Sequence, residues 1–399
     1  MKEIKPSLLF PAALVFYEIA TYLSNDMYLP SLPQISQDMA ISQDLAEYTL
    51  LFWFLGSASM QLLMGPLSDR FGRRIVLMSG GVAYVIANFM CALTPDIYVF
   101  LVARFIQGSA VCSMVVAGYA AIHETYDTTR AIKITAMMGS VTILAPAFGP
   151  LLGAIMLQFA DWRGIFYFLG IWSVLSILFL SKVMQETNPV RVPIHFNDIA
   201  RDFLAIAKRK NFLHFMLPYC LLFMAFICWI VESPFVIIET YHKTPLEYGY
   251  IQLAIFGAFI VGAQIVNFSA GKMTPRFLIK MGIIIAVAAV LLLVLVSLTS
   301  SQAYYSLIGL LMVFSMGSAI AFGPLSRSAI DACTEPMGRR MAIFSTYMNT
   351  FGVAATVVVT LFNDKTMANL SLMIAFGVLL AAIIYYYTSE NPDTKARRS

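Results

Sequence analysis

Four ionisable side chains lie inside long apolar stretches, where a charge is costly. Glu18 and Asp26 occur in the first stretch, Arg104 in the fourth and Glu232 in the seventh. On membrane-insertion scales, a charge at the centre of a bilayer costs about 2.5–3.5 kcal/mol, so those that are kept usually serve a function. A structural ion pair, or a side chain that reaches back to the membrane surface, is the alternative for each. We expect all four to take part in proton exchange and ligand binding.

The two acids of the first stretch share one face of a helix. At 100° per residue, Glu18, Tyr22 and Asp26 lie within about 80°, with about 12 Å between the acids. Asn25 lies beside them. Acids at such a site can exchange a proton against a cationic or polar ligand. The histidines lie in loops or at helix ends, so carboxylates are the expected proton carriers: His123, His195, His214 and His242.

The stretches that hold these residues are typical of membrane helices. The chain is 59% hydrophobic and 12% charged, against about a quarter charged in an ordinary soluble domain. A run of about 20 apolar residues crosses the hydrocarbon core of a bilayer. We therefore predict an all-α membrane protein with 12 transmembrane helices, near residues 8–30, 46–67, 75–94, 97–120, 131–157, 163–184, 212–238, 247–270, 277–298, 303–326, 339–362 and 367–388.

Basic residues predict the orientation, because positively charged loops stay in the cytoplasm. With both termini cytoplasmic, only Arg163, Lys243 and Lys365 lie outside. The polar stretch 185–211 is the predicted cytoplasmic linker. It separates six-helix bundles at 1–184 and 212–390, and 391–399 is the predicted cytoplasmic tail.

Two short motifs recur at matching places in the two halves. Residues 65–74 come after the second helix, and the similar residues 271–280 come after the eighth. Residues 104–110 of the fourth helix align with residues 313–319 of the tenth. Equal orientation of both copies indicates parallel repeats, which place a ligand site near mid-membrane. Arg104 aligns with Val313, which favours a role for the arginine specific to the N-terminal half. It would pair with a first-helix carboxylate or sense its protonation; a local interhelical hydrogen bond is the alternative.

Two further segments contain residues suited to conformational change. The fifth helix contains Pro and Gly residues that break backbone hydrogen bonds and permit close packing: Pro146, Gly149, Pro150 and Gly153. The charged turn after the second helix can lock one helix end to another. The alternative is that its arginines only reflect the preference of positively charged loops for the cytoplasmic side. Its residues are Gly65, Asp69, Arg70, Gly72, Arg73 and Arg74.

Other classes of site receive no support from the sequence. The five cysteines show no C-x-x-C pair, so neither a zinc site nor a disulfide framework is indicated. The basic residues are not clustered as in nucleic-acid binders. We expect no cofactor, no metal and no nucleic acid. The expected partners are a small-molecule substrate, protons and the lipid bilayer, with the chain as a monomer.

Together these motifs resemble the major facilitator superfamily and, within it, the drug:proton antiporters. Residues 65–74 are similar to the family's cytoplasmic signature, Arg104 with Gln107 and Gly108 to its helix-four proton-coupling motif, and 145–153 to its antiporter motif. The resemblance covers nearly the whole chain. It implies the major facilitator fold, and a bacterial inner-membrane protein that exports lipophilic cationic or neutral compounds against protons, a multidrug exporter.

The resemblance also assigns roles to single residues. The segment 17–27 is similar to a first-helix segment in which two acids bind substrate and proton, which implies those roles for Glu18 and Asp26. Tyr22, Asn25 and Tyr119 are implied to line the cavity. The chain departs from the pattern at Ala58, where a cavity methionine is usual, and at Glu232, where glutamine is usual. Glu232 could shift preference towards cations or alter the proton count.

Two other functions stay open at this point. A dedicated carrier of one metabolite, sugar or siderophore would need a more polar cavity than an exporter of lipophilic compounds. A membrane enzyme or receptor would need a nucleophile or metal cluster at mid-membrane, and the sequence contains no such pattern, so we expect no enzyme.

Overall fold

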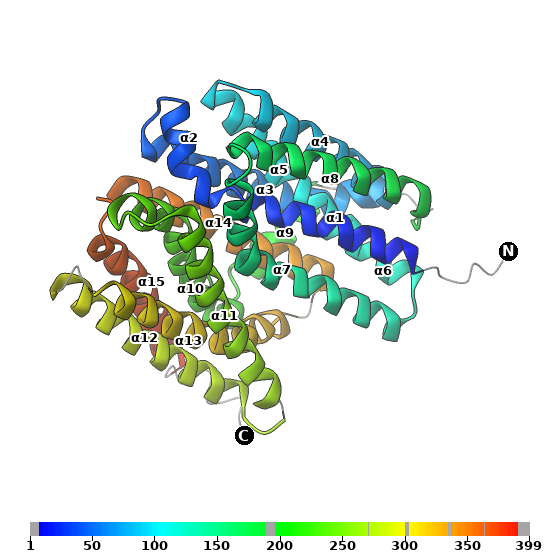
Figure 1. Ribbon diagram of the computed structural model, residues 1–399. Helices are drawn as coiled ribbons and strands as arrows, with labels where there is room; N and C mark the ends of the chain where they lie inside the picture. Colours follow the sequence, from blue (N-terminus) through cyan, green and yellow to red (C-terminus); the bar gives the residue numbers. More distant parts are fainter. Residues whose placement is uncertain are drawn as a thin grey trace, which may run out of the picture. The chain divides into compact units, whose positions relative to one another are not determined.

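The computed structural model describes residues 8–188, 196–269, 271–299, 303–333, 335, 337–362 and 364–389. Part of the predicted linker, 189–195, and the predicted tail, 391–399, lie outside the described residues. The described regular structure is entirely helical (Figure 1).

Helices form at all twelve predicted stretches. In the first half they are α1 (Leu9–Asp26), α3 (Gln43–Phe71), α4 (Arg73–Leu93), α5 (Ile97–Ser113) continued by π-helix η2 (Met114–Gly118) and α6 (Tyr119–Thr125), α7 (Thr128–Met156) and α8 (Trp162–Val183). In the second half they are α10 (Lys210–Pro234) continued by π-helix η3 (Phe235–Thr240), α11 (Pro245–Ser269), α12 (Pro275–Thr299), α13 (Tyr304–Asp331), α14 (Met337–Phe362) and α15 (Met367–Ser389).

Several of these helices begin at a side chain that bonds a free backbone N–H. Ser42 accepts from Leu45 N at the start of α3, and Asp96, Asp127 and Asp161 do the same for α5, α7 and α8. Such caps are favoured because the first N–H groups of a helix have no partner within it.

Three short elements differ from the prediction. The first stretch does not continue as one helix to residue 30: α1 ends at Asp26, and the 3-10 turn η1 (Leu29–Ser31) and α2 (Leu32–Asp38) follow. Pro30 and Pro33 lack an N–H and cannot continue the hydrogen-bonding of α1, so they begin new turns instead. The predicted linker also contains a helix, α9 (Phe196–Ala207).

Ten of the described helices are long and apolar enough to cross a membrane. The two parts of α7, Thr128–Gly139 and Leu144–Met156, meet at a bend of 40° and make up to eleven if they are counted as one span. α1 is not among them, because Glu18, Asn25 and Asp26 lower its mean hydropathy. The prediction of an all-helical membrane protein is confirmed. The orientation of the termini stays a prediction.

The chain divides into two compact units: residues 1–196 with 244–249, and residues 197–243 with 250–399. The predicted limits of the bundles and linker stay predictions. Corresponding glycines of the two repeats pack in the same way within their own units. Gly56 abuts the Phe105 carbonyl in the first unit, and Gly262 abuts the Met316 carbonyl in the second. In both, the second helix of the half packs closely on the fourth.

Candidate functional site

Glu18 lies fully buried in the middle of α1. The Tyr119 hydroxyl of α6 donates to Glu18 Oε1 at 3.0 Å, whereas Oε2 has no hydrogen-bond partner. Tyr22, one turn along α1, packs with Tyr119 against the same apolar cluster. The structure therefore brings Glu18, Tyr22 and Tyr119 together and leaves one buried carboxyl oxygen without a hydrogen-bond partner.

Asp26 ends α1 and is also buried, with 4% of its surface exposed. The two glycines of the α7 motif lie against the end of α1, Gly149 at Asp26 and Gly153 at Met27. A methyl group at Gly149 would come 2.6 Å from Asp26 Cβ, and one at Gly153 would overlap the Met27 carbonyl. Glycine is needed at both positions because the two backbones approach so closely. Pro146 and Pro150 lie in the same part of α7, and the two glycines of this motif pack on the end of α1 at Asp26 and Met27.

Arg104 is fully buried in α5 and joins three helices. Its guanidinium donates to Gln107 Oε1 at 2.7 Å, to the Ser24 carbonyl at 3.1 Å and to the Thr49 carbonyl at 3.3 Å. A longer contact of 3.5 Å reaches Asn25 Oδ1.

The guanidinium also lies 4.2 Å from the centre of the Tyr28 ring, a cation–π distance. The bonds continue from Gln107 Nε2 to Asn88 Oδ1 at 3.0 Å. In the described part of the chain, Arg104 therefore contacts α1 through a backbone carbonyl and Asn25, not through an ion pair with Glu18 or Asp26. Sequence reasoning missed Thr49, Tyr28 and Asn88, whose only signal was a polar group in an apolar stretch.

Glu232 lies in the second unit, near the end of α10, with 1% of its surface exposed. Lys365, from the connection between α14 and α15, places Nζ 3.7 Å from Glu232 Oε2 and 4.8 Å from the centre of the Phe235 ring. The Thr240 hydroxyl donates to the Lys365 carbonyl at 2.8 Å. Glu232 is therefore paired with a basic residue near a helix end, as expected if it forms a structural ion pair.

The turn at 65–74 joins the ends of several helices. Arg73 pairs with Asp69 at 2.6 Å and with Glu124, at the end of α6, at 3.0 Å. After α8, the Glu186 carboxylate accepts from the N–H groups of Arg73 and Arg74 at 2.9 and 3.2 Å, which satisfies the start of α4.

Gly72 permits this cap. Its backbone has φ +102° and ψ 151°, and a methyl group there would run into Glu186. The other residues of the predicted motif differ: Arg70 is exposed beside Phe71, and a methyl group at Gly65 would meet no atom within 4 Å.

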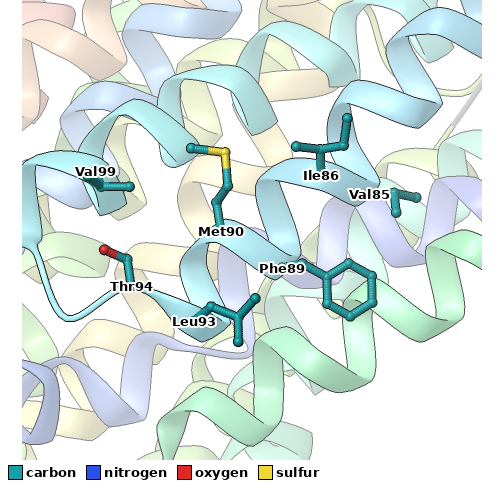
Figure 2. Close-up of a pocket in the computed structure, with 7 residues that line it drawn as sticks. All are labelled: Val85, Ile86, Phe89, Met90, Leu93, Thr94 and Val99. Carbon is teal, nitrogen blue, oxygen red and sulfur yellow. The ribbon is translucent and has the colours of Figure 1, made fainter.

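A separate hollow of about 450 Å³ lies on α4 and its neighbour α5, and Figure 2 shows the side chains that line it. It is lined by Val85, Ile86, Phe89, Met90, Leu93, Thr94 and Val99. Ile86, Leu93 and Val99 are exposed on candidate spans, so we interpret this apolar hollow as a surface that faces lipid. Among the described residues, no three His, Cys, Asp or Glu side chains are placed to hold a metal ion.

Comparison with known proteins identifies the family. The model of the Major Facilitator Superfamily matches residues 14–356. The chain is 32% identical to a protein of Edwardsiella piscicida named Multidrug transporter MdfA, over 87% of this chain and 86% of that one. It is 31% identical to the protein of the same name from Escherichia coli O6:H1, over 84% and 82%.

Solved structures share the fold at much lower identity. A bacterial homologue of the human lysosomal transporter Spinster superposes with a TM-score of 0.74 at 12% identity, covering 98% of each chain. A D-xylose-proton symporter superposes with a TM-score of 0.73 at 14% identity, covering 95% of this chain and 97% of that one. The predicted fold is thereby confirmed, and the chain belongs to the major facilitator superfamily, a family of membrane transporters and not of enzymes.

Proposed function

We propose that this protein exports small lipophilic compounds, cationic or neutral, in exchange for protons. The observation that carries the proposal is the buried carboxyl of Glu18, which has one oxygen bonded to Tyr119 and the other without a partner. An isolated carboxylate is costly to bury, so such a group binds either a proton or a cation. Competition between the two is what exchange of a cation for a proton requires.

Asp26 and Arg104 supply the second part of the mechanism. Asp26 lies where α1 meets the glycines of α7, so a change in its charge acts at a contact with no room for adjustment. Arg104 donates to the backbone carbonyl of Ser24 and approaches the side-chain oxygen of Asn25, two residues and one residue before Asp26. We infer that protonation of Asp26 changes how α1 packs on α7, and that Arg104 keeps the end of α1 in place.

The named relatives support a broad range of substrates. Proteins about 30% identical to this chain carry the name Multidrug transporter MdfA, and we propose multidrug efflux for this chain as well. Their bacterial sources favour the inner membrane as its location. We propose that one chain is the working unit.

Efflux from energised vesicles, with and without a pH gradient, tests the proposal. A panel of cationic and neutral dyes should be exported only when the gradient is present. Dependence on one metabolite, with no proton movement for any dye, would instead indicate a dedicated carrier.

Two substitutions then locate the coupling. Asp26→Asn should abolish coupled efflux and leave the melting temperature unchanged, because the amide keeps the size of the group and removes its proton. Glu18→Gln should weaken cation export about tenfold more than neutral export, since a bond to a charged group contributes about 1.5–3 kcal/mol. Asp331→Asn is the control: this acid is exposed on α13 and paired with Arg327. Full gradient-driven export by the Asp26→Asn/Glu18→Gln double variant would refute both roles.

A further inference from the structure

A half-buried arginine borders one end of the apolar hollow on α4 and α5. Arg163, near the start of α8, donates from Nη1 to the Thr94 carbonyl at 2.7 Å and to the Ala92 carbonyl at 3.2 Å. Thr94 also lines the hollow, next to Leu93. The structure therefore places a guanidinium beside an apolar surface that faces lipid.

This guanidinium is held in place but has no acidic partner. Its Cζ lies 4.2 Å from the centre of the Trp162 ring, which is fully buried. Within the part of the chain that the structure describes, Arg163 forms no ion pair, and its Nε and Nη2 donate to no acceptor. The acids beside these residues in sequence, Asp161 and Asp96, cap the starts of α8 and α5 instead. A fixed cation without a counter-charge is suited to an anionic ligand.

The end of the hollow at Arg163 is also the end of two candidate membrane spans. α4 ends at Leu93 and α5 begins at Ile97, so the connection between them lies outside both spans. Tyr98, on the first turn of α5, is 69% exposed. Exposed tyrosines are typical of the membrane–water interface. Arg163 therefore lies at the depth of the lipid headgroups.

The hollow extends from this end along α4 towards the middle of the membrane. Its residues on α4 run from position 85 to position 94, about 13 Å of helix, close to the ~15 Å of half a hydrocarbon core. Figure 2 shows Thr94 and Val99 at one end and Val85 at the other. Ile86 is 53% exposed, so the hollow is open to the bilayer. Its length and apolar lining fit one acyl chain.

The face of α8 that carries Arg163 also contacts the lining of the hollow. Tyr167 follows Arg163 by four residues, so both lie on one face of the helix. The ring centre of Tyr167 lies 6.4 Å from that of Phe89, which lines the hollow. A methyl group at Gly170 would come 3.1 Å from the same ring. The cation and the apolar hollow are therefore parts of one surface built by α4, α5 and α8.

We propose that this surface binds one phospholipid, with its phosphate on Arg163 and one acyl chain in the hollow. The Nε and Nη2 groups lie along one edge of the guanidinium, and two N–H groups on one edge can bind a phosphate in a bidentate manner. The Nη1 group stays bonded to the end of α4. A lipid held in this way would join α4, α5 and α8 at the membrane surface, and it is distinct from any exported compound.

Three ligands separate the headgroup from the chain when each is titrated against the purified full-length protein in detergent and binding is followed by native mass spectrometry. Dioleoyl phosphatidylglycerol has a phosphate and acyl chains, dioleoylglycerol lacks the phosphate, and glycerol 3-phosphate lacks the chains. The native protein should bind phosphatidylglycerol about tenfold more tightly than either of the others, the effect of a single bond to a charged group.

Substitutions then test each part of the site. Arg163→Gln should weaken binding of phosphatidylglycerol about tenfold and leave the weaker binding of dioleoylglycerol within twofold. Arg163→Lys should lose less, because the positive charge remains but the bidentate edge is lost. Ile86→Trp fills the hollow from its exposed rim, so it should weaken both lipids about fivefold.

Matched controls lie elsewhere in the first unit. Ile75→Trp introduces the same side chain on α4 at a position that is also 53% exposed but lies outside the hollow. Arg130→Gln removes an exposed arginine at the start of α7. Neither should change binding of phosphatidylglycerol by more than twofold.

Equal binding of phosphatidylglycerol by the native protein and by Arg163→Gln would overturn the inference, as would equal losses in Ile86→Trp and Ile75→Trp. If glycerol 3-phosphate binds as tightly as phosphatidylglycerol, the site takes a free anion and not a lipid. Ile86→Trp leaves the bonds of Arg163 to α4 intact, so it decides the question even if Arg163→Gln fails to fold. None of these measurements involves transport, and a failure of gradient-driven efflux would contradict the proposed function alone.

Discussion

The pair formed by Glu232 and Lys365 tests whether a buried acid in this protein binds substrate or only stabilises the fold. If the pair is structural, Lys365→Met leaves Glu232 buried without this cation. Loss of one partner of a buried pair costs about 3–5 kcal/mol. Lys365 is 22% exposed and its contact is 3.7 Å long, beyond the ~2.7–2.9 Å of a strong charge-assisted bond, so we expect about 2 kcal/mol.

The partner substitution should be milder. Glu232→Gln leaves a neutral amide in the core, and the Lys365 ammonium can turn towards solvent, so the expected cost is about 1 kcal/mol or less. Adding Glu232→Gln to Lys365→Met should therefore restore part of the lost stability. For a unit of about 200 residues, 2 kcal/mol corresponds to a fall of roughly 4–8 °C in melting temperature.

Melting temperatures of the two single variants and the double variant, measured together with efflux of one cationic and one neutral compound, test this reasoning. Lys280→Met, at an exposed position on α12, controls for loss of a positive charge. Efflux of both compounds should fall together. If Glu232→Gln instead weakens export of the cation selectively, at unchanged melting temperature, then Glu232 is a binding residue and not a structural one.

Three other substitutions test the first unit. Gly72→Ala should cost about 1–3 kcal/mol, since φ +102° with ψ 151° strains any other residue; a fall in melting temperature absent from Gly65→Ala would confirm it. Gly153→Ala should impair efflux by forcing α7 away from the Met27 carbonyl, whereas Gly139→Ala, in open space, should not. Arg104→Lys should lose most efflux although the charge remains, because an ammonium cannot reach all the acceptors of the guanidinium; wild-type efflux by Arg104→Ala would make the residue purely structural.

The sequence predicted the helices well because twenty-residue apolar runs leave few alternatives in a bilayer. It did not predict the end of α1 at Asp26, where Pro30 and Pro33 begin new turns. It identified Glu18 and Asp26 from the cost of burying a charge and from their shared helix face. The apolar stretch around these acids and their shared face are both local features of one helix, so they can be read from the sequence.

The partners of the other charges could not be predicted in the same way. Arg104 is held by carbonyl groups of α1 and α3, and backbone carbonyls carry no sequence signal. Lys365 lies in a connection more than a hundred residues after Glu232, so only the packing of the second unit brings them together.

The two copies of the repeat use the same pair of helices for different chemistry. In the first unit, the first and fourth helices of the half meet through the bond from Tyr119 to Glu18 and through the contacts of Arg104 with α1. In the second, the corresponding helices meet through the ring contact of Phe226 with Phe314, and Val313 stands where the repeat has Arg104. Each buried ionisable group needs partners or a ligand to offset its desolvation, so the helix pair of the second unit, which has no counterpart of Arg104, can pack through aromatic rings instead. The groups proposed for energy coupling, Glu18, Asp26 and Arg104, therefore all lie in the first unit, and the corresponding pair of helices in the second unit meets through aromatic rings instead.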